Sequence, residues 1–194
     1  GRPDAVPYRV SLTPGASPGP GREVEPNDSV DAAMPLGDSL QIRGSAASDD
    51  IDFFSFSIPD EKAGHLWRIF AVDASRIELS GRDGRLVRVD AEERRLRADS
   101  LALVPGEYSV EVRAESDYVL RVMDLGERPK GFEAEPNNST TDGQRLAFGE
   151  TAEGGFHVER DVDVYLFRQE AAGPVEITIV PADDGVTDAK LFHG

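Results

Sequence analysis

The sequence lacks cysteine and is poor in aromatic residues. With no cysteine among its 194 residues, disulfide bonds and thiolate metal sites are excluded. Aromatic residues make up 7% of the chain, with a single tryptophan. No apolar run approaches the roughly 20 residues that a membrane-spanning helix needs, which predicts no membrane insertion. A domain without disulfides often needs another source of stability, and a bound metal is one option.

Positive charge is also scarce. Lysine and arginine number 21 against 37 aspartates and glutamates, which gives a formal net charge of −16. Binding to nucleic acids or to anionic membranes depends on basic patches, so we expect no nucleic-acid partner. The excess of acid fits a halotolerant or secreted surface, or one that cations neutralise. Hydrophobic residues, at 39%, are sufficient for the core of one or two domains.

One acidic stretch occurs twice. EVEPNDSVDAA at 23–33 returns as EAEPNNSTTDG at 133–143, so that Glu23 and Glu133 are 110 positions apart. Tyr8 and Tyr118 have the same separation. A third landmark, Asp52 in DDIDFFSF, matches an aspartate of DVDVYLF at a separation of 111. A period shared by such different landmarks predicts a tandem repeat of about 110 residues.

The chain between the two acidic stretches has the pattern of β-strands. In 51–59, Phe54, Phe56 and Ile58 alternate with smaller or polar neighbours and are expected to face a core. Further strands are predicted in 65–74, in a hairpin at 75–91, in 100–114 around Pro105 and Gly106, and in 117–124. Short strands separated by turn residues predict an all-β fold, an antiparallel β-sandwich.

The repeat divides the chain into two units joined by linkers. Residues 22–125 are predicted to form a complete sandwich, the first unit, and residues 132–194 the N-terminal part of a second unit. Residues 15–21 and 126–131, rich in glycine and proline, are the predicted linkers. Residues 1–14 match the last strand of a preceding or incomplete unit. The second unit lacks a counterpart of roughly residues 85–110. Either the sequence is part of a longer array of such units, which we favour, or the strand in 1–14 completes the second unit.

The first acidic stretch concentrates oxygen ligands. Glu23 and Glu25 converge because residues two apart in an extended chain point the same way. Asn27 and Asp28 follow in a turn after Pro26. Calcium prefers about 6–8 oxygen ligands, so these four need a partner segment.

The partner segment precedes the strand at 51–59. Asp50 and Asp52 share the phase of the core-facing Phe54, and a carboxylate there is costly unless it is paired or metal-bound. Asp49 is a further candidate ligand. The second unit repeats the arrangement with Asp161 and Asp163. Alternatively, the acidic stretches are solvated turns and the aspartates cap strand ends, but their repetition favours a metal site.

Four motifs of the first unit resemble the bacterial pre-peptidase C-terminal (PPC) domain family, to which collagen-binding domains of bacterial collagenases are similar. They are EVEPN at 23–27, DIDFF at 50–54, GEYSV at 106–110 and YVL at 118–120. The second unit matches the first two of these motifs. The resemblance implies a jelly-roll-like β-sandwich in a secreted, periplasmic or cell-surface bacterial protein. It also implies a non-catalytic role beside enzymatic or adhesive domains.

Some members of that family bind calcium through the same motifs. The positions carried over are Glu23, Glu25, Asn27, Asp28, Asp49 and Asp52 in the first unit, and Glu133, Glu135, Asn137 and Asp163, with Asp161, in the second. Asn138 stands where the first unit has an acid, which predicts weaker binding at the second site because affinity follows ligand charge.

The sequence therefore predicts a calcium-stabilised spacer or binding module and not an enzyme. Its partners would be neighbouring domains of the same chain and an extracellular protein or polysaccharide. The alternative is a carbohydrate- or protein-binding, collagen-binding-like adhesion module attached to a secreted hydrolase. Trp67 is predicted to be a core residue. The arginine-rich run at 82–97 is predicted to be a solvated hairpin whose charges protect an edge strand. The three histidines, His65, His157 and His193, are too dispersed for a zinc or catalytic site.

Overall fold

The structure is a computed structural model that describes residues 21–46, 50–82, 84–91, 95–154, 162–180 and 189–191. Within these ranges the chain forms β-strands and two 3-10 helices, and no α-helix. None of the described residues belongs to a helix that could cross a membrane. The predicted strand in 1–14 and the candidate ligands Asp49 and Asp161 lie outside the described residues.

Seven strands form one sheet in the first unit. They are β1 (Met34–Pro35), β2 (Gln41–Ser45), β3 (Asp52–Ile58), β4 (His65–Gly81), β5 (Gly84–Asp90), β6 (Arg95–Leu101) and β7 (Gly106–Glu127). Two 3-10 turns, η1 (Val30–Ala32) and η2 (Asp60–Lys62), lie before β1 and after β3. Two further strands, β8 (Gln144–Arg145) and β9 (Tyr165–Leu166), belong to the second unit.

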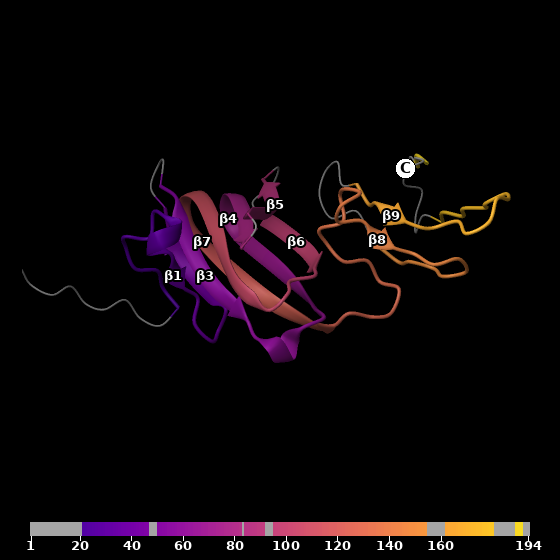
Figure 1. Cartoon of the computed structure of the whole chain (residues 1–194). Helices are drawn as coiled ribbons and strands as arrows, with labels where there is room; N and C mark the ends of the chain where they lie inside the picture. Colours follow the sequence, from indigo (N-terminus) through magenta and orange to yellow (C-terminus); the bar gives the residue numbers. More distant parts are fainter. Residues whose placement is uncertain are drawn as a thin grey trace, which may run out of the picture.

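The long strands β4 and β7 pair with each other in antiparallel fashion and run through the whole first unit (Figure 1). β3 pairs with the first part of β7 and β2 with its later part, while β6 and β5 pair with successive parts of β4. The sheet thus has two halves that share two continuous strands. All of these pairings are antiparallel, as predicted, but β1 and β3 are parallel, so that the sheet is mixed.

β4 and β7 are each one continuous strand where the sequence predicted two. The break expected after residue 74 is a bulge in β4, where the register with β7 shifts on both sides of Ala74 and Asp73 has a positive φ of 63°. The strands expected at 106–114 and 117–124 are one strand: β4 pairs with β7 on both sides of residues 115 and 116, and β2 joins from Asp117. β7 also continues through residues 126 and 127, which were predicted to be linker.

The core lies between the two halves of the sheet. Phe54, Phe56 and Ile58 are buried, as their alternation predicts. The ring of Phe54 in β3 meets Tyr118 of β7 edge-on, with centroids 6.4 Å apart. Trp67 is 3% exposed, which confirms that it is a core residue.

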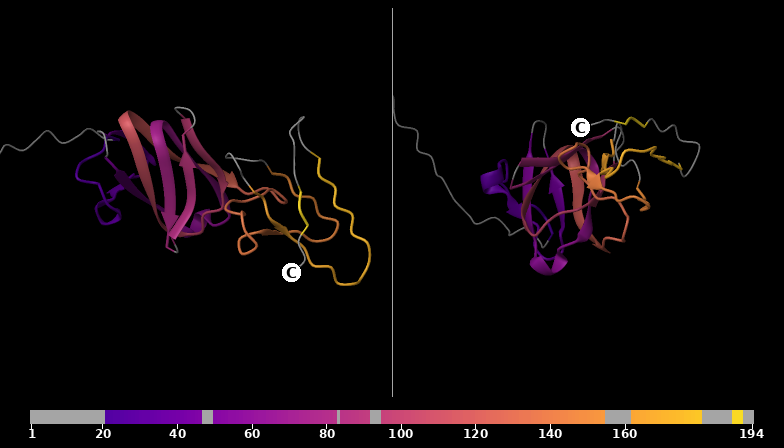
Figure 2. Two further views of the ribbon diagram at one scale, coloured as in Figure 1. Left: turned by 90° about the horizontal axis from the view of Figure 1, so that it is seen from above. Right: turned by 45° about the vertical axis from the view of Figure 1, so that its right-hand side comes forward.

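The second unit has no comparable apolar core among its described residues. β8 and β9 form a short parallel pair, and the other described residues of this unit are mainly irregular chain (Figure 2). Several of its large apolar side chains are exposed, among them Phe148, Val162, Ile177 and Ile179. Its buried described residues are all polar: Glu133, Glu135 and Asn137.

Candidate cation sites

The opening segment of the first unit is held against both halves of the sheet. The N–H of Glu23 donates to the carbonyl of Arg43 in β2 at 3.0 Å, and the N–H of Arg43 donates to the carbonyl of Gly21 at 2.8 Å. Directly after the cis peptide bond between Glu25 and Pro26 the chain meets β3, where the N–H of Phe53 donates to the carbonyl of Asn27 at 2.9 Å. The segment therefore presents its acids between the end of β2 and the start of β3, which pair with successive parts of β7.

The structure brings most of the predicted ligands together. Carboxylate oxygens of Glu23, Glu25 and Asp52 lie within 4.8 Å of one another. Glu25 also belongs to a second group, with Asp28 and Asp50, that meets the same limit. Both groups offer oxygen only, which is the donor chemistry of a hard cation such as calcium.

Tyr118 completes the first group, a role that the sequence analysis missed. Its hydroxyl lies 2.6 Å from Oδ2 of Asp52 and 2.9 Å from Oε2 of Glu23. The other oxygen of Glu23 accepts the N–H of Ser45 at 2.9 Å. The sequence signal for this tyrosine is its match with Tyr8 at the same 110-residue spacing as the acidic stretches.

Burial makes the negative charge of this group costly. Asp52 is fully buried, and desolvation raises the pKa of its carboxyl to about 6, against the opposing effect of the Tyr118 hydrogen bond. Desolvation likewise raises the pKa of Glu23, and that of the Tyr118 phenol. Repulsion from neighbouring carboxylates adds to each of these pKa shifts. Binding a proton or a cation is therefore more favourable for the group than leaving all its carboxylates ionised and unpaired.

Two glycines allow the carboxylates to approach the backbone. A Cβ on Gly44 would overlap both the carboxylate of Glu23 and the ring of Tyr118. In the second unit, a Cβ on Gly154 would overlap the carboxylate of Glu133. The two glycines are 110 positions apart and each directly follows the residue that accepts the glutamate N–H. Any other residue here would displace the acid.

The second opening segment has the same local hydrogen bonds. Glu133 donates to the carbonyl of Glu153 at 2.8 Å, and Val164 donates to Asn137 at 3.0 Å. The N–H of Asn137 donates to Glu135 at 3.0 Å, as that of Asn27 does to Glu25. The peptide bond before Pro136 is cis, like the one before Pro26.

These bonds assemble a further group of carboxylates, the one of the second unit. Oxygens of Glu133, Glu135 and Asp163 lie within 4.8 Å of one another. Asn138, at the position of Asp28, is exposed. The hydroxyl of Tyr165 lies 3.4 Å from Oε2 of Glu133, and desolvation raises its pKa to about 12.

Other candidate residues have structural partners. His65 contacts Asp124 at 2.7 Å, and Lys62 reaches the same carboxylate at 2.8 Å. His157 and His193 lie outside the described residues. In the arginine-rich region, Arg97 pairs with Asp99 and Arg88 with Asp90. The first of these pairs lies within β6 and the second within β5. Because β5 and β6 each pair with β4, the described part of this run forms two strands of the sheet and not the single hairpin predicted.

Comparison with known proteins gives limited matches. No protein-family model matches the sequence, and no curated protein matches it. The structure is similar to the crystal structure of the pre-peptidase C-terminal domain of a collagenase from Bacillus anthracis. The TM-score is 0.40 and the sequences are 18% identical, over 47% of this chain and 94% of that domain.

Proposed function

We propose that this chain is a non-catalytic, calcium-stabilised β-sandwich module of a secreted or cell-surface bacterial protein, of the PPC type. It would consist of tandem units of about 110 residues, each with its own cation site. The observation that carries the proposal is the buried polar centre of the second unit. Glu133, Glu135 and Asn137 are buried where a soluble domain would normally place apolar side chains.

The residues of both sites fit calcium. Every side chain in the three carboxylate groups offers oxygen, and each group draws on two separate segments of chain. In the second unit the side-chain amide of Asn137 is buried, and neither its oxygen nor its nitrogen has a hydrogen-bond partner among the described residues. Such a group calls for an explanation, and a cation that accepts its carbonyl oxygen as a ligand is one.

Calcium would act here as a structural cross-link. Neutralising clustered carboxylates removes their mutual repulsion and ties the opening segment to the strand that carries Asp52 or Asp163. A ligand that binds only the folded state stabilises it by mass action. The module would then serve as a stiff spacer or binding element whose partners are neighbouring domains of the same chain.

A thermal melt tests the proposal. Unfolding is recorded in EGTA and in millimolar calcium for the wild type, Asp52→Asn and Asp163→Asn, with Asp60→Asn as the control because Asp60 is exposed in η2. We expect calcium to raise the melting midpoint of the wild type and of Asp60→Asn. In Asp52→Asn, calcium should no longer raise the melting midpoint of the first unit. Equal midpoints with and without calcium in the wild type would refute the proposal.

A further inference from the structure

The second opening segment is also bonded to the first unit. The N–H of Glu135 donates to the carbonyl of Ser100 at 2.9 Å, and the N–H of Ala102 donates to the carbonyl of Glu135 at 2.7 Å. These bonds form a parallel bridge between Glu135 and Leu101, the last residue of β6. Figure 1 shows the second unit beyond β6, on the side where this strand ends.

This contact distinguishes the two sites. Glu25 is exposed, whereas Glu135, at the corresponding place in the second segment, is 6% exposed. Both glutamates have the same local bond to the asparagine two residues later. The end of β6 is the additional neighbour of Glu135, so the first unit contributes to the burial of the second site.

The end of β6 has an unusual backbone at the point of contact. Ser100 is buried and has a positive φ of 54°, a conformation that residues other than glycine rarely adopt. Its carbonyl is the one that accepts the Glu135 N–H. A backbone held in this region points to a local function, and the bonded neighbour here is the opening segment.

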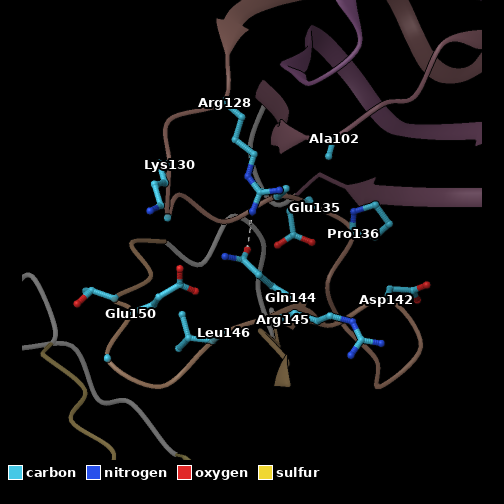
Figure 3. Close-up of a pocket in the computed structure, with 14 residues that line it drawn as sticks. Ala102, Arg128, Lys130, Glu135, Pro136, Asp142, Gln144, Arg145, Leu146 and Glu150 are labelled. Carbon is cyan, nitrogen blue, oxygen red and sulfur yellow. Dashed lines mark hydrogen bonds between the residues drawn. The ribbon is translucent and has the colours of Figure 1, made fainter. Parts of the chain in front are cut away.

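The linker adds a second connection through one residue. The backbone N–H of Arg128 donates to Gly64 of the first unit at 3.1 Å. Its guanidinium donates to the carbonyl of Phe132 at 2.7 Å and to Gln144 in β8 at 2.9 Å. Figure 3 shows Arg128 reaching Gln144 beside Ala102 and Glu135, around a pocket of about 730 Å³.

We propose that the end of β6 is a docking surface for the opening segment of the following unit, and that docking is coupled to cation binding at Glu133, Glu135 and Asp163. This inference rests on the proposed function. The backbone of Glu135 is held by β6 while its carboxylate belongs to the cation group. A cation that fixes the carboxylate therefore favours the backbone conformation that β6 binds. Because coupling between two binding events is reciprocal, docking in turn strengthens cation binding.

The test removes one docking hydrogen bond and leaves every carboxylate in place. Ala102→Pro deletes the N–H that Glu135 accepts, and Ala102→Ser keeps it; the side chain of Ala102 is exposed, so serine is tolerated. Both are placed in the Asp52→Asn background, which disables the first site, and calcium binding is measured by calorimetry. We expect Ala102→Pro to weaken binding at the second site about fivefold or more, and Ala102→Ser to change it less than twofold.

A second variant, on the linker, controls for the possibility that Ala102→Pro weakens calcium binding only by disturbing the fold around β6. Arg128→Ala keeps β6 intact and removes the guanidinium bonds to the second unit. It should weaken calcium binding in the same direction as Ala102→Pro. If both variants bind calcium as tightly as their parent, the coupling is refuted.

Distances between the units give an independent readout. Because the chain has no cysteine, spin labels at Ser57→Cys and Thr141→Cys, both exposed, report on the two units alone. Calcium should narrow the distance distribution in the wild type and leave it broad in Ala102→Pro. Calcium binding without narrowing in the wild type would refute the coupling but leave the proposed function intact. Absence of calcium binding at both sites would refute the proposed function itself.

Discussion

The side chains of Tyr118 and Asp52, 66 residues apart in sequence, are joined by a 2.6 Å hydrogen bond in the interior of the first unit. The same hydroxyl lies 2.9 Å from Glu23. A hydroxyl has one proton to donate, so it can satisfy only one carboxylate at a time. The second contact is a hydrogen bond only when one of the two acids carries a proton, and the raised pKa of Asp52 favours that form toward pH 6 and below. The hydroxyl thus links the opening segment, β3 and β7.

Tyr118→Phe should destabilise the first unit, most strongly without calcium. Loss of the hydroxyl leaves buried carboxylate oxygens short of a donor, which costs about 1–3 kcal/mol in EGTA. Urea unfolding with and without calcium measures the effect. The control is Tyr108→Phe, whose hydroxyl bonds to the carbonyl of Val104 and to no acid. Its cost should be the same in both conditions, and a calcium-independent loss in Tyr118→Phe would contradict the prediction.

Stability in EGTA should fall as the pH rises from about 4 to about 6. The pKa of Asp52 is about 6 in the folded protein and 3.8 in an unfolded chain, so in this window the folded state holds the extra proton. The free energy of unfolding therefore decreases with rising pH and stays low above pH 6. The difference in unfolding free energy between wild type and Asp52→Asn isolates this carboxyl. It should change by at most about 3 kcal/mol across the window, and by about 1–2 kcal/mol once solvent screening is taken into account. Parallel curves for the two proteins would contradict the assignment.

Gly44→Ala should disrupt the first site. The added Cβ overlaps Glu23 and Tyr118, so the opening segment must shift away from β2. We expect a loss of about 1–3 kcal/mol, typical of overpacking, and weaker calcium binding. Gly173→Ala is the matched control because nothing lies within 4 Å of the position of its added Cβ. A thermal melt in EGTA and in calcium distinguishes the two variants, and equal effects would contradict the clash.

Phe56→Ala and Phe167→Ala compare corresponding positions of the two units. Phe56 is 5% exposed and stacks on Tyr108 of β7, whereas Phe167 is 38% exposed and meets only Phe148 among the described aromatic rings. Phe56→Ala should cost about 3–5 kcal/mol. Phe167→Ala should cost less than about 1 kcal/mol. Chemical denaturation followed by circular dichroism measures both, and a large loss for Phe167→Ala would indicate that this face is covered in solution.

Local patterns in the sequence were sufficient for several predictions. Alternation in 51–59 predicted which side chains of β3 are buried, because successive side chains of a strand point to opposite faces. The repeated acidic stretches predicted where carboxylates cluster, because residues two apart in an extended chain point to the same side and so lie close together. The pairing of Glu23 with Asp52 was predicted on other grounds: four local ligands are too few for calcium, and a carboxylate in the core-facing phase of a strand needs a partner.

The sequence by itself determined the alternation of buried and exposed residues, the oxygen-only chemistry of the two acidic segments and their 110-residue spacing. These properties depend on residue types and short-range geometry. Only the tertiary structure decided that β4 and β7 run unbroken through both halves of the sheet, that Tyr118 reaches Asp52, and that Glu135 docks on β6. Each of these depends on hydrogen bonds and packing between residues far apart in the chain, and no local pattern specifies which distant partner satisfies them.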